Sequence, residues 1–138
     1  MKINISRIND AVNLQATSEE GIKIVMDGSA AIGGQNLGMR PMQLLLTSLG
    51  GCTSMDVLSI LKKMQQEVEA YDVVVDGIRE EGVEPSLFRN INIHFKLKGK
   101  LDAGKVQRAI ELSMTKYCSV AKTLEPTATI THDFEIVA

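Results

Sequence analysis

The sequence predicts an α+β fold made of antiparallel sheets and one long central helix, in a single domain over residues 1–138. Apolar and polar residues alternate near both ends of the chain, which is the period of a half-buried strand. Between these ends, apolar residues at three- and four-residue spacings over 42–64 predict a helix. No strand–helix–strand unit recurs, so we do not expect a parallel α/β sheet.

Residues 3–26 predict a three-stranded meander. Apolar residues alternate with polar neighbours on both sides of a turn at Asn9-Asp10, and again after Gly21. The alternating residues are Ile3, Ile5, Val12, Leu14, Ala16, Ile22, Ile24 and Met26. Residues 28–38 then hold four of the eleven glycines, a composition that predicts a loop.

A long, largely buried helix is predicted to begin at Pro41, because proline suits the first helical turn, and to end near Met64. Its apolar members are Met42, Leu45, Leu46, Leu49, Cys52, Val57, Ile60, Leu61 and Met64. The uncharged stretch ends at Asp56 and contains two glycines, so we do not expect a membrane span.

The second half of the chain predicts a hairpin, a helix and a last strand. In order, these are alternating strands at 71–78 and 91–97 around a turn at 82–85, a helix from Asp102 to Tyr117, a helical turn at 118–124 and an alternating strand at 128–136. Asp102 is a residue type that caps helix N-termini, and Pro126 releases the chain into the last strand.

Charge and composition exclude several classes of function. Fifteen Lys and Arg against seventeen Asp and Glu give a net charge of −2 without a basic block, so neither nucleic acid nor a membrane surface is an expected partner. The N-terminus lacks the continuous apolar run of a signal peptide, and we therefore expect a cytoplasmic protein. In a reducing compartment its two cysteines are expected to be thiols.

Cys52 follows two consecutive glycines, Gly50 and Gly51, within the predicted helix. Each glycine costs on the order of 1 kcal/mol relative to alanine, which indicates close approach of another backbone or a local break. If the helix restarts at Cys52, free backbone N–H groups would stabilise a thiolate there. The alternative is a buried cysteine that packs as a small apolar side chain.

Cys118 lies between Lys116 and Lys122, whose positive charge would favour its thiolate. The distance in sequence between Cys52 and Cys118 does not say whether the two thiols meet, and each has the alternative of simple packing.

We expect no metal and no cofactor. The nominal ligand set is Cys52, His94, Cys118 and His132, and no two of these are close enough in sequence to form the short chelating pair of a structural zinc site. His94 is expected to face solvent, and nothing in the spacing places a histidine beside Cys52 for a Cys/His hydrolase.

Three segments carry a resemblance to a known family: Arg40–Leu46, Leu49–Cys52 and Tyr117–Lys122. Pro41 stands eleven residues before the first cysteine, and the second cysteine has a Cys-x-Val context. Together they resemble the OsmC/Ohr family of thiol-dependent peroxidases, especially its YhfA-like branch. The match in element order covers nearly the whole chain.

The resemblance implies an intertwined α+β homodimer with its active sites at the subunit interface. It implies that Cys52 is the peroxidatic thiol, which forms a sulfenic acid, and that Cys118 is the resolving thiol. Arg40 is the candidate activating arginine, and an external dithiol would be the reductant. A pocket for a small hydrophobic peroxide or another electrophile would be lined by Met42, Gln43, Leu45 and Leu49.

Two departures from the family pattern keep a second function open. Met42 stands where family peroxidases place a Glu after the motif proline, and Arg40 takes a position usually held by Asn. Met42 favours a non-catalytic ligand-binding or redox-sensing dimer, whereas the two thiols in recognisable contexts favour a peroxidase. We rank the peroxidase first.

Overall fold

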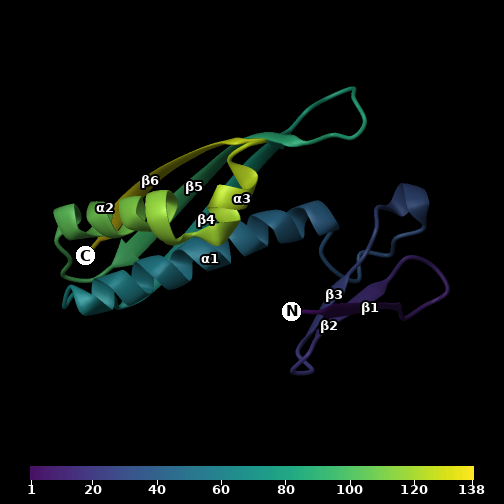
Figure 1. The fold of residues 1–138 in the computed structure, drawn as a ribbon, viewed down its shortest axis with the longest axis horizontal. Helices are drawn as coiled ribbons and strands as arrows, with labels where there is room; N and C mark the ends of the chain where they lie inside the picture. Colours follow the sequence, from purple (N-terminus) through teal and green to yellow (C-terminus); the bar gives the residue numbers. More distant parts are fainter. The chain divides into compact units, whose positions relative to one another are not determined.

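The computed structural model describes residues 1–138 and has two compact units, residues 1–45 and 46–138 (Figure 1). Each unit contains one three-stranded sheet, and the long helix α1 (Pro41–Lys63) begins in the first unit and continues into the second. The α+β class predicted from the sequence is confirmed.

The sheet of residues 1–45 is the predicted meander. Strands β1 (Ile3–Arg7), β2 (Leu14–Ser18) and β3 (Lys23–Met26) pair antiparallel in the order β1-β2-β3. The side chain of Asn9 closes the first turn by accepting the backbone N–H groups of Ala11 and Asn13.

One carboxylate organises the glycine-rich loop that follows β3. Asp27 is 2% exposed and accepts backbone N–H groups of Gly28, Gln35 and Leu37 at 2.8, 3.0 and 3.1 Å. The bonds from Gln35 and Leu37 are the main reason that the pKa of Asp27 is lowered, and Arg40 adds a smaller electrostatic contribution. The loop is thus pinned from within, and it contains the short 3₁₀ helix η1 (Ala30–Ile32).

Helix α1 runs without a break through Gly50 and Gly51, so of the two alternatives that the sequence left open, a local break with a restart at Cys52 does not occur. Gly50 is buried, and a Cβ there would lie 2.8 Å from Cγ2 of Val75. A Cβ at Gly51 would meet nothing within 4 Å. The first glycine therefore serves close packing of α1 on a neighbouring side chain, and it does not create a free helix N-terminus.

Burial of α1 is confined to one face, which is less than the sequence predicts. The buried residues are Leu49, Gly50, Thr53, Val57 and Leu61. By length and composition alone α1 would suffice to cross a membrane. Its most apolar 18-residue segment has a mean hydropathy of 1.5, and 28% of that segment is buried. The buried face carries hydrogen-bonded polar groups and packs against the second sheet, as a core helix does.

The second sheet has the order β4-β5-β6, formed by β4 (Ala70–Arg79), β5 (Phe88–Lys98) and β6 (Thr129–Val137). The pair β4–β5 is the predicted antiparallel hairpin. The pair β5–β6 is parallel, so the expectation of purely antiparallel pairing is wrong for these two strands. The helical connection between them returns the chain to the end at which β5 began.

That connection consists of α2 (Ala103–Leu112), a π-helical turn η2 (Ser113–Tyr117) and α3 (Ser119–Leu124). The side chain of Asp102 accepts the backbone N–H of Lys105 at 2.9 Å, which confirms the predicted cap. Helices α1, α2 and α3 lie on one face of the sheet (Figure 1). The buried residues of β5 that face them are Phe88, Ile91, Ile93, Phe95 and Leu97.

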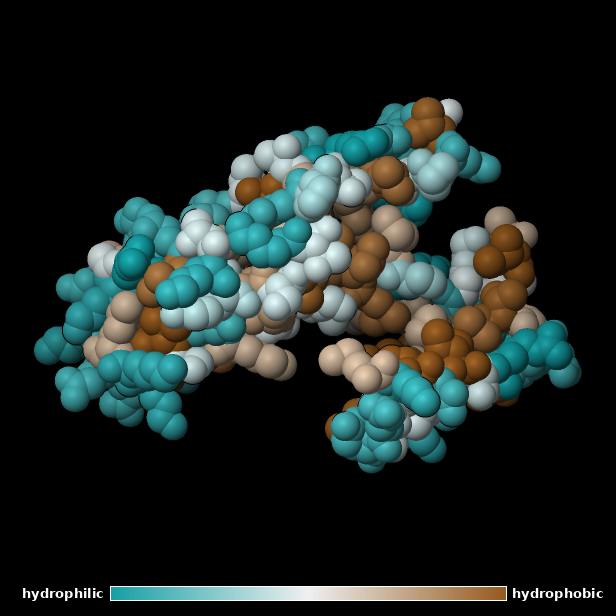
Figure 2. Space-filling model, viewed as in Figure 1, coloured by the Kyte–Doolittle hydropathy of each residue, from teal (hydrophilic) through white to brown (hydrophobic).

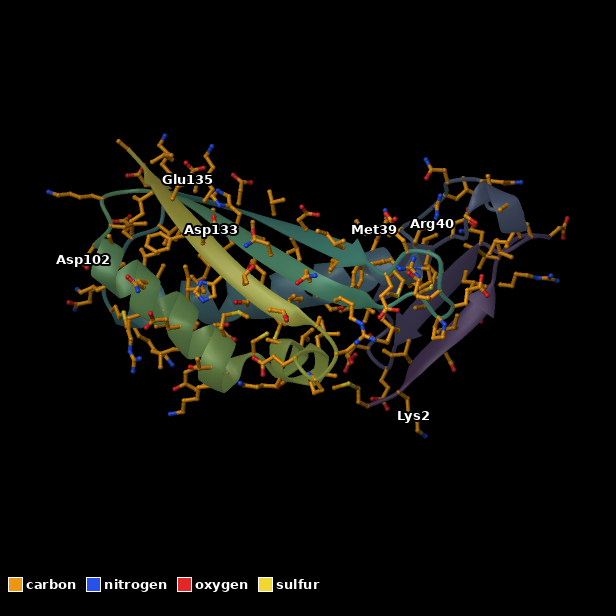
Figure 3. All side chains as sticks on the ribbon, turned by 90° about the horizontal axis from the view of Figure 1, so that it is seen from above. Lys2, Met39, Arg40, Asp102, Asp133 and Glu135 are labelled. Atoms are coloured by element: carbon orange, nitrogen blue, oxygen red, sulfur yellow. The ribbon has the colours of Figure 1, made fainter.

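The other face of this sheet is polar along β5 and β6, whereas β4 exposes Val74 and Ile78 there. His94 is 36% exposed, as predicted, and lies between the carboxylates of Asp133 and Glu135, which both project from β6 (Figure 3). Hydrogen bonds to Asp133 and Glu135 raise the pKa of His94, and the bond to Asp133 has the larger effect.

Gly50→Ala is expected to lower the free energy of unfolding by about 1–3 kcal/mol, because the new methyl group overlaps Val75. Gly51→Ala is the matched control and is expected to raise it by about 1 kcal/mol, because alanine favours the helix and meets open space. Chemical denaturation of the two variants measures both changes. Equal effects of the two substitutions would contradict the packing described for α1.

Candidate active site

The two thiols meet within residues 46–138. Cys52 lies on α1 and is half-buried, whereas Cys118 immediately precedes α3 and is fully buried. Both are free cysteines. Their sulfur atoms and a carboxylate oxygen of Asp56 all lie within 4.8 Å of one another. The structure thus joins two cysteines that are far apart in the sequence and adds an acidic residue to them.

Local structure positions all three groups. Asp56 follows Cys52 by four residues on α1, so both side chains occupy one face of that helix. Cys118 has an extended backbone, with φ −74° and ψ 101°, between η2 and α3. Its N–H donates to the carbonyl of Ser113 at 2.8 Å, and its sulfur accepts the N–H of Ala121 at 3.4 Å. The π-helical turn therefore ends by turning the Cys118 side chain inward.

A short chain of hydrogen bonds ties α1 to this turn. The Ser113 hydroxyl donates to Oδ2 of Asp56 at 2.8 Å, and the hydroxyls of Thr53 and Ser113 lie 2.9 Å apart. Thr53 and Ser113 are both fully buried. Because the Ser113 hydroxyl donates its one proton to the carboxylate, its oxygen is free to accept from Thr53, whose hydroxyl also lies 3.7 Å from the Met114 sulfur. The chain fixes the Asp56 carboxylate beside the thiols.

Burial controls the acidity of Cys118. The pKa of its thiol is raised to about 11, mainly by desolvation and to a smaller extent by the adjacent Cys52 thiol, while the Ala121 N–H acts in the opposite direction. The expectation that neighbouring lysines favour the Cys118 thiolate is therefore wrong. The ammonium group of Lys116 lies 5.3 Å from the Tyr117 ring centroid, and that of Lys122 pairs with Glu125 at 3.1 Å.

Two surface grooves adjoin α1 near these groups. One has a volume of about 350 Å³ and is lined by Asp56, Ser59, Ile60, Lys63, Met64, Leu112 and Tyr117. The other has a volume of about 340 Å³ and is lined by Leu46, Thr47, Gly50, Gly51, Ser54, Val73 and Val75. The first groove opens the carboxylate side of the cluster to small solutes.

The remaining predicted site residues divide between the two units. Arg40 lies in residues 1–45, where its N–H donates to Oε1 of Gln43 at 2.8 Å and its guanidinium to the Gly38 carbonyl at 3.3 Å. Met42 and Leu45 also belong to this unit, and Leu45 is 39% exposed. Leu49 belongs to the second unit and is fully buried in its core. The activating role of Arg40 and the pocket role of the other four stay predictions.

Asp56 and Ser113 are the site residues that sequence reasoning missed. The four-residue spacing from Cys52 to Asp56 is visible in the sequence and, on a helix, places a carboxylate next to the thiol. Ser113 has no comparable signal, because its contact with Asp56 joins separate elements.

The chain belongs to the OsmC-like protein family, whose model matches residues 33–133. It is 42% identical to protein YhfA of Escherichia coli K12 over 122 residues, which cover 88% of this chain and 87% of that protein. The sequence resemblance to this family and branch is therefore confirmed.

Solved structures share the fold of this chain. The crystal structure of a hypothetical protein from Aquifex aeolicus is 29% identical, with a TM-score of 0.81 and coverage of 99% of this chain and 97% of that one. An organic hydroperoxide resistance protein from Legionella pneumophila, described as a predicted redox protein, has a TM-score of 0.71 at 12% identity, with 98% and 97% coverage. The second likeness shows a shared fold alone.

Iodoacetamide is expected to alkylate Cys52 well before Cys118. With a pKa of about 11, Cys118 is ionised to only about one part in a thousand at pH 8, and it is fully buried. Peptide mass spectrometry over a pH series measures both rates, and a denatured sample gives the reference. Faster labelling of Cys118 at pH 8 would contradict its placement.

The same pKa predicts a pH dependence of stability. The unfolded thiol ionises near pH 9 and the folded thiol near pH 11, so the contribution of Cys118 to stability is complete below pH 9 and is lost as the pH rises through 11. Cys118→Ser removes this dependence in alkaline denaturation curves.

Proposed function

We propose that the chain is a cytoplasmic dithiol peroxidase that reduces organic hydroperoxides. The observation that carries the proposal is the position of two thiols within 4.8 Å of each other, one half-buried and one fully buried. Family membership supports it, as does the similarity in fold to proteins named for organic hydroperoxide resistance. Because Cys52 is the more exposed of the two thiols, we assign the attack on the peroxide to Cys52 and the formation of the disulfide to Cys118.

The proposed chemistry is a two-electron reduction of the peroxide. The Cys52 thiolate attacks the distal peroxide oxygen, the O–O bond breaks, and the products are a sulfenic acid on Cys52 and an alcohol. The Cys118 sulfur then attacks the Cys52 sulfur, a disulfide forms, and the hydroxyl group leaves as water. An external dithiol reduces the disulfide and restores both thiols.

Asp56 is the proposed base for the second step. A buried thiol with a raised pKa must lose its proton to become a nucleophile, and the Asp56 carboxylate lies within 4.8 Å of both sulfurs. The same carboxyl group returns the proton to the departing hydroxyl group. Ser113 orients Asp56 for this transfer through its 2.8 Å hydrogen bond.

Arg40 and the apolar residues near it are proposed to serve the substrate. An arginine stabilises the thiolate and donates to the departing alkoxide, and Asp27 supplies a carboxylate that interacts electrostatically with Arg40 where Met42 cannot. Met42 and Leu45 would favour an apolar peroxide over hydrogen peroxide. A ligand-binding or redox-sensing protein is the second candidate, favoured by Met42 at the position of the family's glutamate.

A second copy of this chain is the proposed partner. Large apolar side chains are exposed on both units, and Figure 2 shows brown, apolar areas on the face in view. They include Ile3, Ile5 and Ile24 in the first unit and Met55, Leu58, Val74 and Ile78 in the second. So much exposed apolar surface on a small chain is typical of an obligate interface.

Sedimentation at micromolar concentration is expected to show only dimer. Met55 is 74% exposed and Val74 62% exposed in the single chain, so Met55→Lys with Val74→Lys is expected to weaken association. Lys105→Glu on the exposed face of α2 is the control. A stable monomer of the unaltered chain with a native circular dichroism spectrum would contradict the proposal.

One equivalent of an organic hydroperoxide is expected to consume both thiols and leave an intramolecular Cys52–Cys118 disulfide. Cys118→Ser is expected to trap Cys52 as sulfenic or sulfinic acid, and Cys52→Ser to leave Cys118 reduced.

Arg40→Met is expected to slow the oxidation of Cys52 by the peroxide, and Arg108→Met, at an exposed position of α2, serves as its matched control. Intact and peptide mass spectrometry follow each species.

Two reduced thiols after prolonged exposure to a moderate excess of organic hydroperoxide would rule out the peroxidase. That result would favour the ligand-binding candidate.

A further inference from the structure

The thiol cluster gathers three groups that can each carry a negative charge. The two sulfurs and the Asp56 oxygen lie within 4.8 Å of one another, and the groups that donate hydrogen bonds to them are the Ser113 hydroxyl and the backbone N–H groups of Ala121 and Val120. No lysine, arginine or histidine forms an ion pair with Asp56. Ionised groups so close together in a partly buried site need a cation or must hold their protons.

We propose that the reduced chain binds one zinc ion through Cys52, Cys118 and Asp56. Zinc–sulfur bonds of about 2.3 Å and zinc–oxygen bonds of about 2.1 Å place neighbouring ligand atoms of a tetrahedral site about 3.5 to 3.8 Å apart. The observed cluster lies within 4.8 Å, so its atoms need to approach by about 1.3 Å at most. Rotation of the Cys52 side chain on the surface of α1 accommodates such a shift.

The ligand types favour zinc over the hard cations magnesium and calcium. Thiolates favour zinc over magnesium and calcium, which prefer sites made wholly of oxygen ligands. Three protein ligands leave the fourth position of a tetrahedral ion open. The groove lined by Asp56 gives an ion a path to the carboxylate, and Ser113 supplies the outer hydrogen bond that typically orients a ligand.

Zinc binding and peroxide reduction exclude each other in this site. The ion replaces the two thiol protons without a change in oxidation state, so affinity rises with pH. A Cys52–Cys118 disulfide removes both sulfur ligands, so only the reduced form binds. Zinc therefore protects the thiols from oxidation, and oxidation by a hydroperoxide releases the ion.

A second group of potential ligand side chains, His94, Asp133 and Glu135, lies on the outer face of the sheet. It lacks sulfur, lies on the polar outer face, and its histidine nitrogens are both engaged by carboxylates. Substitution of His94 is therefore the control for zinc that binds at this surface group instead of at the thiols.

The test is a titration of the reduced, full-length chain, without oxygen, against a chromophoric zinc chelator. We expect one ion per chain, and cobalt is expected to give a thiolate-to-metal charge-transfer band. Cys52→Ser and Cys118→Ser should each remove the band or halve it, with a large loss of affinity. Asp56→Asn should weaken binding about 10- to 100-fold, as loss of a ligand or of its orienting partner does. His94→Ala should leave binding unchanged.

The oxidised, unaltered chain is a control that requires no substitution, and it should not bind zinc. Absence of stoichiometric binding, binding that survives oxidation, or binding lost in His94→Ala would each overturn the proposal. The peroxide experiment uses metal-free protein, so either proposal can fail while the other stands. Circular dichroism of each variant establishes that it is folded.

Discussion

The chain of hydrogen bonds from Thr53 through Ser113 to Asp56 is the interaction on which the site depends. It joins the middle of α1 to the π-helical turn that ends at Cys118, and both hydroxyls are fully buried. Buried hydroxyls without partners would cost about 1–3 kcal/mol each, so the two elements are held in one relative position. The two thiols lie side by side because these elements do.

Burial gives the two thiols different properties. Cys118 caps α3 from inside the core, where desolvation keeps its thiol protonated at neutral pH. Cys52 lies on the partly exposed side of α1, two residues after Gly50, which allows the helix to approach Val75. One cysteine is accessible and the other is buried, and the Asp56 carboxylate lies within 4.8 Å of both sulfurs and lines a surface groove. This arrangement is suited to stepwise thiol chemistry.

Local patterns predicted most of the fold. The alternation of apolar and polar residues predicted the meander and the hairpin, and Pro41 and Asp102 indicated the starts of two helices. Contacts between distant elements were less predictable. The parallel pairing of β5 with β6 depends on where the helical connection returns the chain, and the role of Gly50 depends on Val75.

In the candidate site, too, local patterns predicted single residues but not the contacts between distant elements. Motif positions identified Cys52 and Cys118, whereas their proximity required the fold. The lysines beside Cys118 suggested a thiolate, but their side chains contact Tyr117 and Glu125. Burial therefore has the largest effect on the pKa of Cys118 and raises it. Asp56 was visible as a residue one helical turn from Cys52, although its link to Ser113 was not.

A crystal structure of the reduced, metal-free protein tests the central claim most directly. We predict an unbroken α1 through Gly50 and Gly51, with both sulfurs and the Asp56 carboxylate within 4.8 Å of one another and Ser113 bonded to Asp56. A Cys118 side chain turned away from Cys52, or a helix that restarts at Cys52, would contradict it.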